Sequence, residues 1–211
     1  WPMSQRSPSR NAFVSTDSWV PKRSVKWTFK AEAATSASPA VVDGVVHLPT
    51  GDGRLVSLEA STGELRWEFA SSGPVRSSPA VAERFVYVGL DDGRIVALDR
   101  DTGRLQWSFE TGEQVLSSPV VHEGVVYVGS NDWHLYALDA ATGERRWRFK
   151  ASNSITSDPG VHPPVVAFVD LHGRLYVLNI KNAKVRFYYE TAVTAGGGPV
   201  FQGDRVYVAD G

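Results

Sequence analysis

One spacing runs through the whole chain and constrains its fold more than any other feature. A proline recurs every forty residues, and an aromatic residue recurs at the same interval (Pro39, Pro79, Pro119, Pro159 and Pro199; Trp27, Trp67, Trp107, Trp147 and Phe187). Because no insertion breaks either series, we expect each copy to be a closed unit with connections of fixed length. A repeat of about forty residues made of short strands is typical of one blade of a β-propeller.

Each copy contains four short apolar segments separated by turn residues. The first segment, Ser38–Val41 in the first copy, is expected to line a central channel. The second and third segments, such as Phe85–Val88 and Ile95–Leu98, are nearly continuous apolar runs, which indicates strands covered on both faces. We therefore predict an all-β fold with four complete four-stranded antiparallel blades near residues 36–70, 76–110, 116–150 and 156–190, and almost no helix.

Partial copies flank these four blades. Val25–Lys30 matches the last strand of a repeat and is predicted to be an orphan outer strand, while residues 197–211 hold the first two strands of a fifth copy. Asn11–Thr16 could supply a third strand, but its apolar residues are out of register with the other copies. We therefore expect a lead-in at residues 1–24, followed by residues 25–211 as part of a larger propeller.

The glycine and tryptophan of each copy suggest how neighbouring blades are joined. Glycine leaves its peptide bare, so an indole from the adjacent blade can lie directly on it, and recurrence favours this packing role over ligand stacking. In the fourth copy Asn182-Ala183 replaces Thr-Gly, and Phe187 is predicted to dock on Ala183 in a weaker joint. The predicted docking residues are Trp27, Trp67, Trp107, Trp147 and Phe187, with Gly63, Gly103 and Gly143 and the small residues Ser57, Ala97 and Ala137.

One turn departs from the pattern. Other copies carry glycine between their second and third strands, where positive φ is wanted, but the third copy carries Trp133. This replacement has a conformational cost, and a large aromatic side chain on a rim loop can anchor an interface. Trp133 and the neighbouring His134 are therefore candidate partner contacts. The alternative is that Trp133 folds back over the edge of its own blade and covers Tyr136 or the neighbouring turn.

Composition argues against several functions. The formal net charge of −1 gives no overall field to attract nucleic acid or an anionic membrane, and no apolar run approaches the roughly 18 residues of a membrane span. The absence of cysteine removes disulfides, thiolate metal sites and a cysteine nucleophile. The turn carboxylates are explained by turn chemistry, and the histidines show no metal-ligand or triad spacing (Asp91, Asp92, Asp132, Asp170; His47, His122, His134, His162, His172). We predict no catalytic residue, no metal and no cofactor.

The docking pattern resembles that of the PQQ-like (pyrroloquinoline-quinone-like) propeller repeats, Ala-x-Asp-x-x-Thr-Gly-x-x-x-Trp. Two copies match it fully (Ala97, Asp99, Thr102, Gly103, Trp107; Ala137, Asp139, Thr142, Gly143, Trp147). The resemblance covers residues 25–211 and implies a propeller, eight-bladed in relatives of this kind. Trp1-Pro2-Met3 with Arg10 also resembles the opening segment of exported members, which implies a periplasmic or extracellular location.

The familiar branches of this family are quinoprotein alcohol dehydrogenases, BamB-like scaffolds of the outer-membrane barrel assembly machine and sensor ectodomains of bacterial kinases. The dehydrogenases add a vicinal cysteine pair and a calcium-binding acidic cluster. Because this chain has no cysteine, the favoured function is a non-enzymatic scaffold, BamB-like or sensor-ectodomain-like, for unidentified protein partners in a membrane-associated complex. The alternative is the N-terminal part of a quinoprotein dehydrogenase whose active-site residues lie outside this chain.

Overall fold

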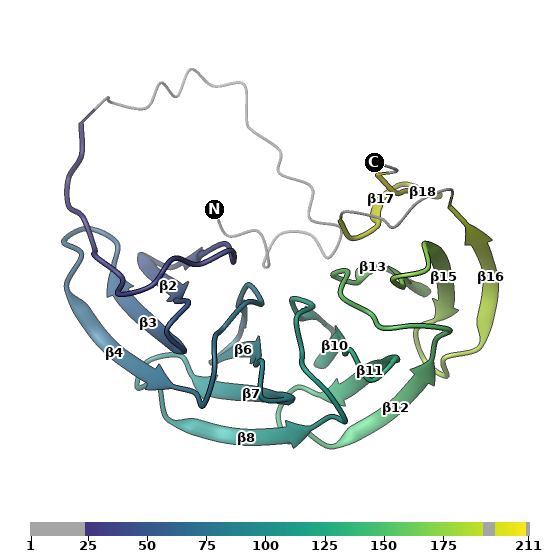
Figure 1. The fold of residues 1–211 in the computed structure, drawn as a ribbon, viewed down its shortest axis with the longest axis horizontal. Coiled ribbons are helices and arrows are strands. Elements are labelled where there is room, and N and C mark those ends of the chain that lie inside the picture. Colours follow the sequence, from purple (N-terminus) through teal and green to yellow (C-terminus); the bar gives the residue numbers. More distant parts are fainter. Residues whose placement is uncertain (1–23, 192–196, 210–211) are drawn as a thin grey trace.

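The computed structural model describes residues 24–191 and 197–209, which form an arc of stacked sheets (Figure 1). Four four-stranded antiparallel sheets follow one another, with a two-stranded sheet after them, and these residues contain no helix. The predicted four-bladed all-β architecture is confirmed. The blades are β1 (Ala40–Val42), β2 (Val45–Pro49), β3 (Arg54–Glu59), β4 (Leu65–Ala70); β5 (Ala80–Ala82), β6 (Phe85–Gly89), β7 (Arg94–Asp99), β8 (Leu105–Glu110); β9 (Val120–His122), β10 (Val125–Gly129), β11 (His134–Asp139), β12 (Arg145–Lys150); β13 (Gly160–His162), β14 (Val165–Val169), β15 (Arg174–Asn179), β16 (Val185–Glu190); and β17 (Val200–Gln202) with β18 (Arg205–Tyr207).

In each blade the four strands follow one another from the inside of the arc to its outer edge, where β4, β8, β12 and β16 lie (Figure 1). The short first strands β1, β5, β9, β13 and β17 contact one another in order, as expected for strands that line the centre. The outermost strands β4, β8, β12 and β16 each pair with only one neighbour in their sheet. In every blade the pairing of the third and fourth strands shifts register once, for example between Ala97 and Leu98. Such a bulge increases the twist of the outer strand.

The hydrophobic core lies between successive sheets. The four central residues of the third strand, such as Ile95 to Leu98, are buried in every blade. Side chains from the first and second blades share one cluster, and the second and third blades share another. The apolar runs in the sequence therefore reflect burial on two faces, because each sheet packs between two others.

Three expectations about the ends of elements need correction. Val25–Lys30 does not form a strand, because the described residues offer no third strand for it to pair with. The first strand begins at Ala40 rather than Ser38, and the Ser38 amide instead donates to Ser78 Oγ of the next blade at 2.9 Å. In the fifth copy, β18 ends at Tyr207. Asn11–Thr16 and the opening segment lie outside the described residues.

Candidate functional site

Tryptophan residues docked on glycine join the middle blades. A Cβ atom built on Gly103 would lie 2.6 Å from the Trp67 ring, and one on Gly143 would lie 2.6 Å from the Trp107 ring. Each indole also donates a hydrogen bond to a backbone carbonyl of the next blade, from Trp67 to Arg100 at 2.8 Å and from Trp107 to Ala140 at 3.0 Å. The glycine is required here because any side chain would occupy the space of the indole.

Each small residue of the predicted set lies beside a tryptophan of its own blade. Ala97 is the cross-strand partner of Trp107, and Ala137 and Ser57 occupy the same place beside Trp147 and Trp67. The indole is thus held between a small residue of its own sheet and a bare peptide of the next one. These contacts account for the recurring tryptophans by packing alone.

The first and last aromatic residues of the series differ from the middle ones. Trp27 lies on Gly63 although it is not in a strand, and its indole donates to the Ala60 carbonyl at 3.0 Å. Ala183 packs in the cluster that contains Trp147, whose indole donates to the Ile180 carbonyl at 3.0 Å. The four tryptophans of the series therefore each dock on the following blade, and the predicted docking of Phe187 on Ala183 is wrong. Phe187 is 49% exposed, because the described part of the following blade contains only β17 and β18.

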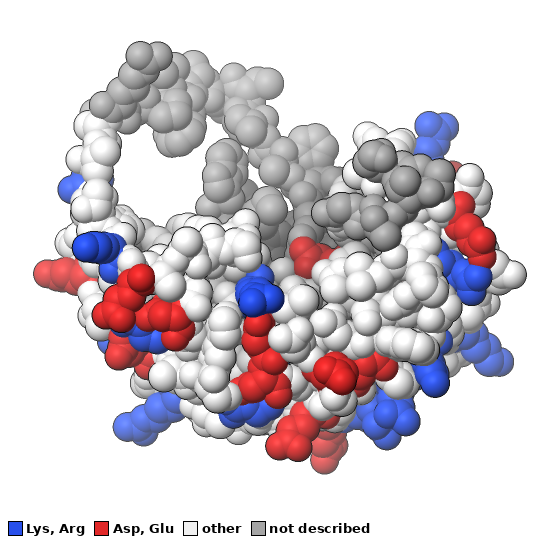
Figure 2. All heavy atoms as spheres, in the orientation of Figure 1, with Lys and Arg blue, Asp and Glu red and all other residues white. Residues whose placement is uncertain are grey.

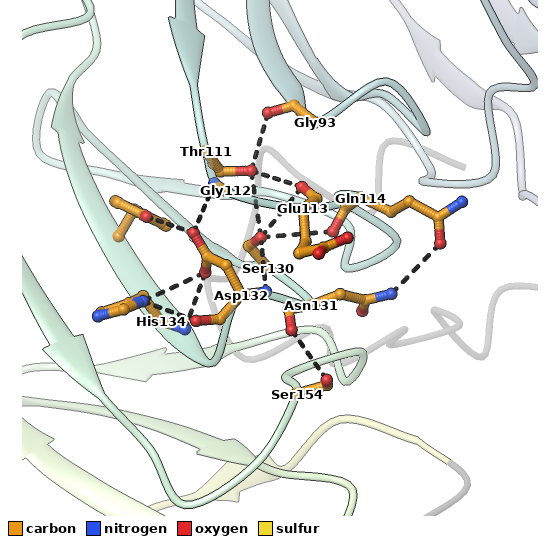
Figure 3. Close-up of polar contacts among 11 residues, drawn as sticks. Gly93, Thr111, Gly112, Glu113, Gln114, Ser130, Asn131, Asp132, His134 and Ser154 are labelled. Atoms are coloured by element: carbon orange, nitrogen blue, oxygen red, sulfur yellow. Dashed lines mark hydrogen bonds and ion pairs between the residues drawn. The ribbon is translucent and has the colours of Figure 1, made fainter.

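A polar network surrounds the turn between β10 and β11 (Figure 3). Asp132 accepts hydrogen bonds from the Gly112 amide at 2.8 Å, from the Tyr136 hydroxyl at 2.6 Å and from the His134 amide at 3.0 Å. Burial alone would raise the pKa of Asp132, but the hydrogen bonds from Tyr136, Gly112 and His134 lower that pKa below its ordinary value. The carboxylate is therefore charged and committed to holding this turn against the loop after β8.

The two candidate contact residues on this turn are placed differently from each other. Trp133 has a φ of 74° and is 44% exposed, and the Lys150 ammonium lies 5.9 Å from the centre of its ring. His134 is largely buried, with Nδ1 2.8 Å from the Asp132 carbonyl oxygen and its ring beside Tyr136. The exposed surface thus belongs to Trp133, and His134 serves the interior of the turn.

The turn that carries Trp133 also lacks a hydrogen bond that the other three blades make. After β4, β8 and β16 a hydroxyl donates to the carbonyl of the turn glycine, as from Thr111 to Gly93 at 2.8 Å (the other pairs are Ser71 with Gly53 and Thr191 with Gly173). Ala151 takes this place after β12, so only its amide bonds to the Trp133 carbonyl, at 2.8 Å. The third blade therefore accepts a strained residue and gives up a side-chain hydrogen bond at the same turn.

Sequence reasoning missed the side chains that border Trp133. β12 reads RRWRFK, and Lys150 at its end reaches the indole. The local run of basic residues was visible in the sequence, but the overall charge of the chain did not reveal it.

Within residues 24–191 and 197–209 no His, Asp and Glu side chains group in a way that could hold a metal ion. The same ranges include no helix able to cross a membrane.

Four-stranded blades joined by an indole laid on a glycine define a β-propeller of PQQ-like repeats. The family model described as outer membrane protein assembly factor BamB matches residues 20–130 and 91–211. The chain therefore belongs to this BamB-type family of PQQ-repeat propellers. A comparison with curated proteins found no significant match.

Solved structures show the same fold. BamB from Moraxella catarrhalis superimposes with a TM-score of 0.78 at 23% identity, over 88% of this chain and 61% of that protein. A computationally designed protein gives a TM-score of 0.74 at 17% identity, over 81% of this chain and 54% of its own. Quinohemoprotein alcohol dehydrogenase from Pseudomonas putida gives 0.70 at 17% identity, over 85% of this chain and 39% of the enzyme. The chain thus spans less than two-thirds of each of these proteins.

Proposed function

We propose that this chain is a non-enzymatic platform that binds a protein partner in the cell envelope, with Trp133 as an anchor on its rim. The observation that carries the proposal is the exposed indole at a φ of 74°, where the other blades have glycine. A non-glycine residue in this conformation costs stability. Large aromatic side chains are enriched among the residues that dominate binding at interfaces. Membership of the BamB family supports the location.

Three of the four turn carboxylates support a role without catalysis. Asp170 is buried and accepts hydrogen bonds from the Ser152 hydroxyl at 2.6 Å and the His172 amide at 3.0 Å. Asp92 accepts a hydrogen bond from the Ser72 hydroxyl of the segment after β4, and Asp132 holds its own turn, as described above. Each of these groups is therefore engaged in joining a turn to its surroundings, rather than being directed at an open site.

Replacing Trp133 with glycine tests the proposal directly. Trp133→Gly restores the residue of the other turns, so thermal stability should stay unchanged or rise by up to about 1 kcal/mol. Recovery of envelope proteins cross-linked to the chain in cells should fall sharply. Leu171→Ala is the matched control, because Leu171 is 42% exposed on the corresponding turn of the fourth blade. Equal recovery of the same proteins by wild type and Trp133→Gly would contradict the proposal.

A second candidate function is the quinoprotein one, and the superposition on quinohemoprotein alcohol dehydrogenase over 85% of this chain is the observation that favours it. Titration with pyrroloquinoline quinone and calcium, followed by quenching of tryptophan fluorescence, separates the two functions. The platform proposal expects no saturable quenching. Stoichiometric binding of the quinone would reverse the ranking.

A further inference from the structure

The outer strand of the third blade differs in charge from the other three outer strands. Four of the six residues of β12 are basic, and none is acidic (Arg145, Arg146, Arg148 and Lys150). β4 and β16 each carry one basic and one acidic residue, and β8 carries a single acidic residue. Basic side chains gather along the outer edge of the molecule where β12 runs (Figure 2). The overall charge of −1 therefore hides a local basic strip.

Most of this positive charge is not neutralised within the described part of the chain. Arg146 pairs with Asp139, with 2.8 Å between the guanidinium and the carboxylate. Within the described ranges, Arg145, Arg148 and Lys150 have no carboxylate within ion-pair distance. All four basic residues of β12 are exposed. Solvated cations that have no carboxylate partner are available to an acidic ligand at little desolvation cost.

The strip is continuous with Trp133 and lies on an unpaired strand edge. Lys150 is the cross-strand partner of His134, and its ammonium lies 5.9 Å from the centre of the Trp133 ring. β12 ends its sheet, and in the described residues it pairs only with β11. Its outer backbone groups are therefore free to pair with an added extended segment, as edge strands do in peptide recognition.

We propose that β12 and Trp133 together bind an acidic, extended polypeptide segment, which places its carboxylates on Arg145, Arg148 and Lys150 and an apolar side chain on Trp133. This proposal rests on the platform function and specifies the chemistry of its partner. The neighbouring outer strands end in Glu110 and Glu190, both exposed. A broad anionic surface such as a membrane would meet these carboxylates, whereas a single strand laid along β12 meets only cations.

Edge protection alone does not account for the strip. Charged side chains on an edge strand discourage pairing between molecules. However, β4, β8 and β16 are also edge strands, and none of them carries more than one basic residue. The concentration of charge is specific to the blade that carries Trp133.

The test measures binding of a fluorescein-labelled, glutamate-rich peptide with one central leucine, long enough to span β12, by fluorescence anisotropy. A variant with Arg145→Gln, Arg148→Gln and Lys150→Gln should bind this peptide about tenfold more weakly than wild type. The matched control is Arg66→Gln, Arg104→Gln and Lys181→Gln, which removes the same charge from exposed positions elsewhere and should stay within about twofold of wild type. The corresponding glutamine-rich peptide should not bind wild type, which tests the charge without altering the protein.

Three results would overturn the proposal: no binding of the glutamate peptide to wild type, equal weakening by both triple variants, or equal binding of the glutamine peptide. Binding of phosphatidylglycerol vesicles that depends on β12, without peptide binding, would also overturn it in favour of a membrane surface. If the peptide result fails while Trp133→Gly still abolishes cross-linking in cells, only the acidic partner is excluded. If Trp133→Gly has no effect in cells, the platform function itself fails.

Discussion

The joint between the first and second blades and the joint between the second and third blades share one packing geometry but differ in their hydrogen bonds. In both, a Cβ on the docking glycine would come within 2.6 Å of the indole, Trp67 on Gly103 and Trp107 on Gly143. In the second joint the Tyr87 hydroxyl also donates to the Ala140 carbonyl, at 3.1 Å, beside the bond from Trp107. Two polar groups of one blade thus share an acceptor on the next.

In the first joint, His47 stands in the place of Tyr87 and packs against Trp67, with 5.5 Å between ring centres. Both ring nitrogens of His47 and the hydroxyl of its cross-strand partner Ser57 are buried without a hydrogen-bond partner in the described residues. Burial first, and then the positive charges of Arg100 and Arg66, lower the pKa of His47 from 6.5 to about 4. The first joint therefore has the same contact between indole and glycine, but the polar groups beside its indole make fewer hydrogen bonds than those of the second joint.

A second difference between the two blades concerns a buried serine hydroxyl. The Ser77 hydroxyl donates to the Gly89 carbonyl at 2.9 Å and accepts from its amide at 2.8 Å. In the first blade Ala37 and Pro49 occupy these positions, so the amide donor is lost together with its hydroxyl acceptor, whereas the Pro49 carbonyl loses only the hydroxyl donor. Losing both partners of a bond is close to neutral, whereas leaving one buried group unpaired is expensive. The comparison teaches that the contact between indole and glycine fixes the geometry of both joints. The polar residues beside the indole, His47 and Ser57 in the first joint and Tyr87 in the second, change how stable each joint is.

The largest effect should come from removing the indole. Trp107→Ala should lower the free energy of unfolding by about 3–5 kcal/mol, because the side chain is buried between two sheets. Phe187→Ala is the contrasting variant and should cost less than about 1 kcal/mol, because Phe187 is half-exposed. Urea denaturation measures both. Equal losses would show that docking on the next blade contributes nothing.

The second effect is a pH dependence of the free energy of unfolding that comes from His47 in the first joint. Because His47 has a folded pKa of about 4 against an ordinary 6.5, the unfolded chain binds a proton that the folded chain does not between these values. Stability should therefore fall as the pH drops from 6.5 towards 4, by up to about 3 kcal/mol from this residue. Urea unfolding of wild type and His47→Tyr at about pH 7 and about pH 4.5 isolates the contribution of His47 to the free energy of unfolding. An identical pH dependence in both proteins would rule it out.

The smallest effect separates the polar layers. Tyr87→Phe removes a buried hydrogen bond but leaves the Ala140 carbonyl paired with Trp107, so the loss should be about 1 kcal/mol. His47→Phe at neutral pH should cost nothing or stabilise, because the nitrogens that it removes have no partner in the described residues. Thermal unfolding of the two variants side by side checks the difference. A larger loss at His47 would indicate that its nitrogens are hydrogen-bonded after all.

The forty-residue period was sufficient to predict the blades, the turn glycines and the unusual turn at Trp133. These features are local, because a hairpin needs particular residues at its turn and a strand buried on two faces needs an apolar run. Trp133 was found because it breaks a local rule, and its φ of 74° shows that the backbone keeps the conformation of glycine. Only the exposure of its side chain needed the structure.

What joins one blade to the next was decided by tertiary structure. The forty-residue spacing could not decide which aromatic residue docks on Ala183, because Trp147 and Phe187 are both in register with it. The stacking order of the sheets assigns Ala183 to Trp147. The same holds for Val25–Lys30, whose strand-like sequence has no third strand to pair with in the described residues. It holds also for β12, whose basic residues became a candidate site only when the structure placed Lys150 beside Trp133. The sequence alone determined each repeat, since its hairpins are closed by neighbours along the chain, whereas contacts between repeats depend on how the sheets stack in space.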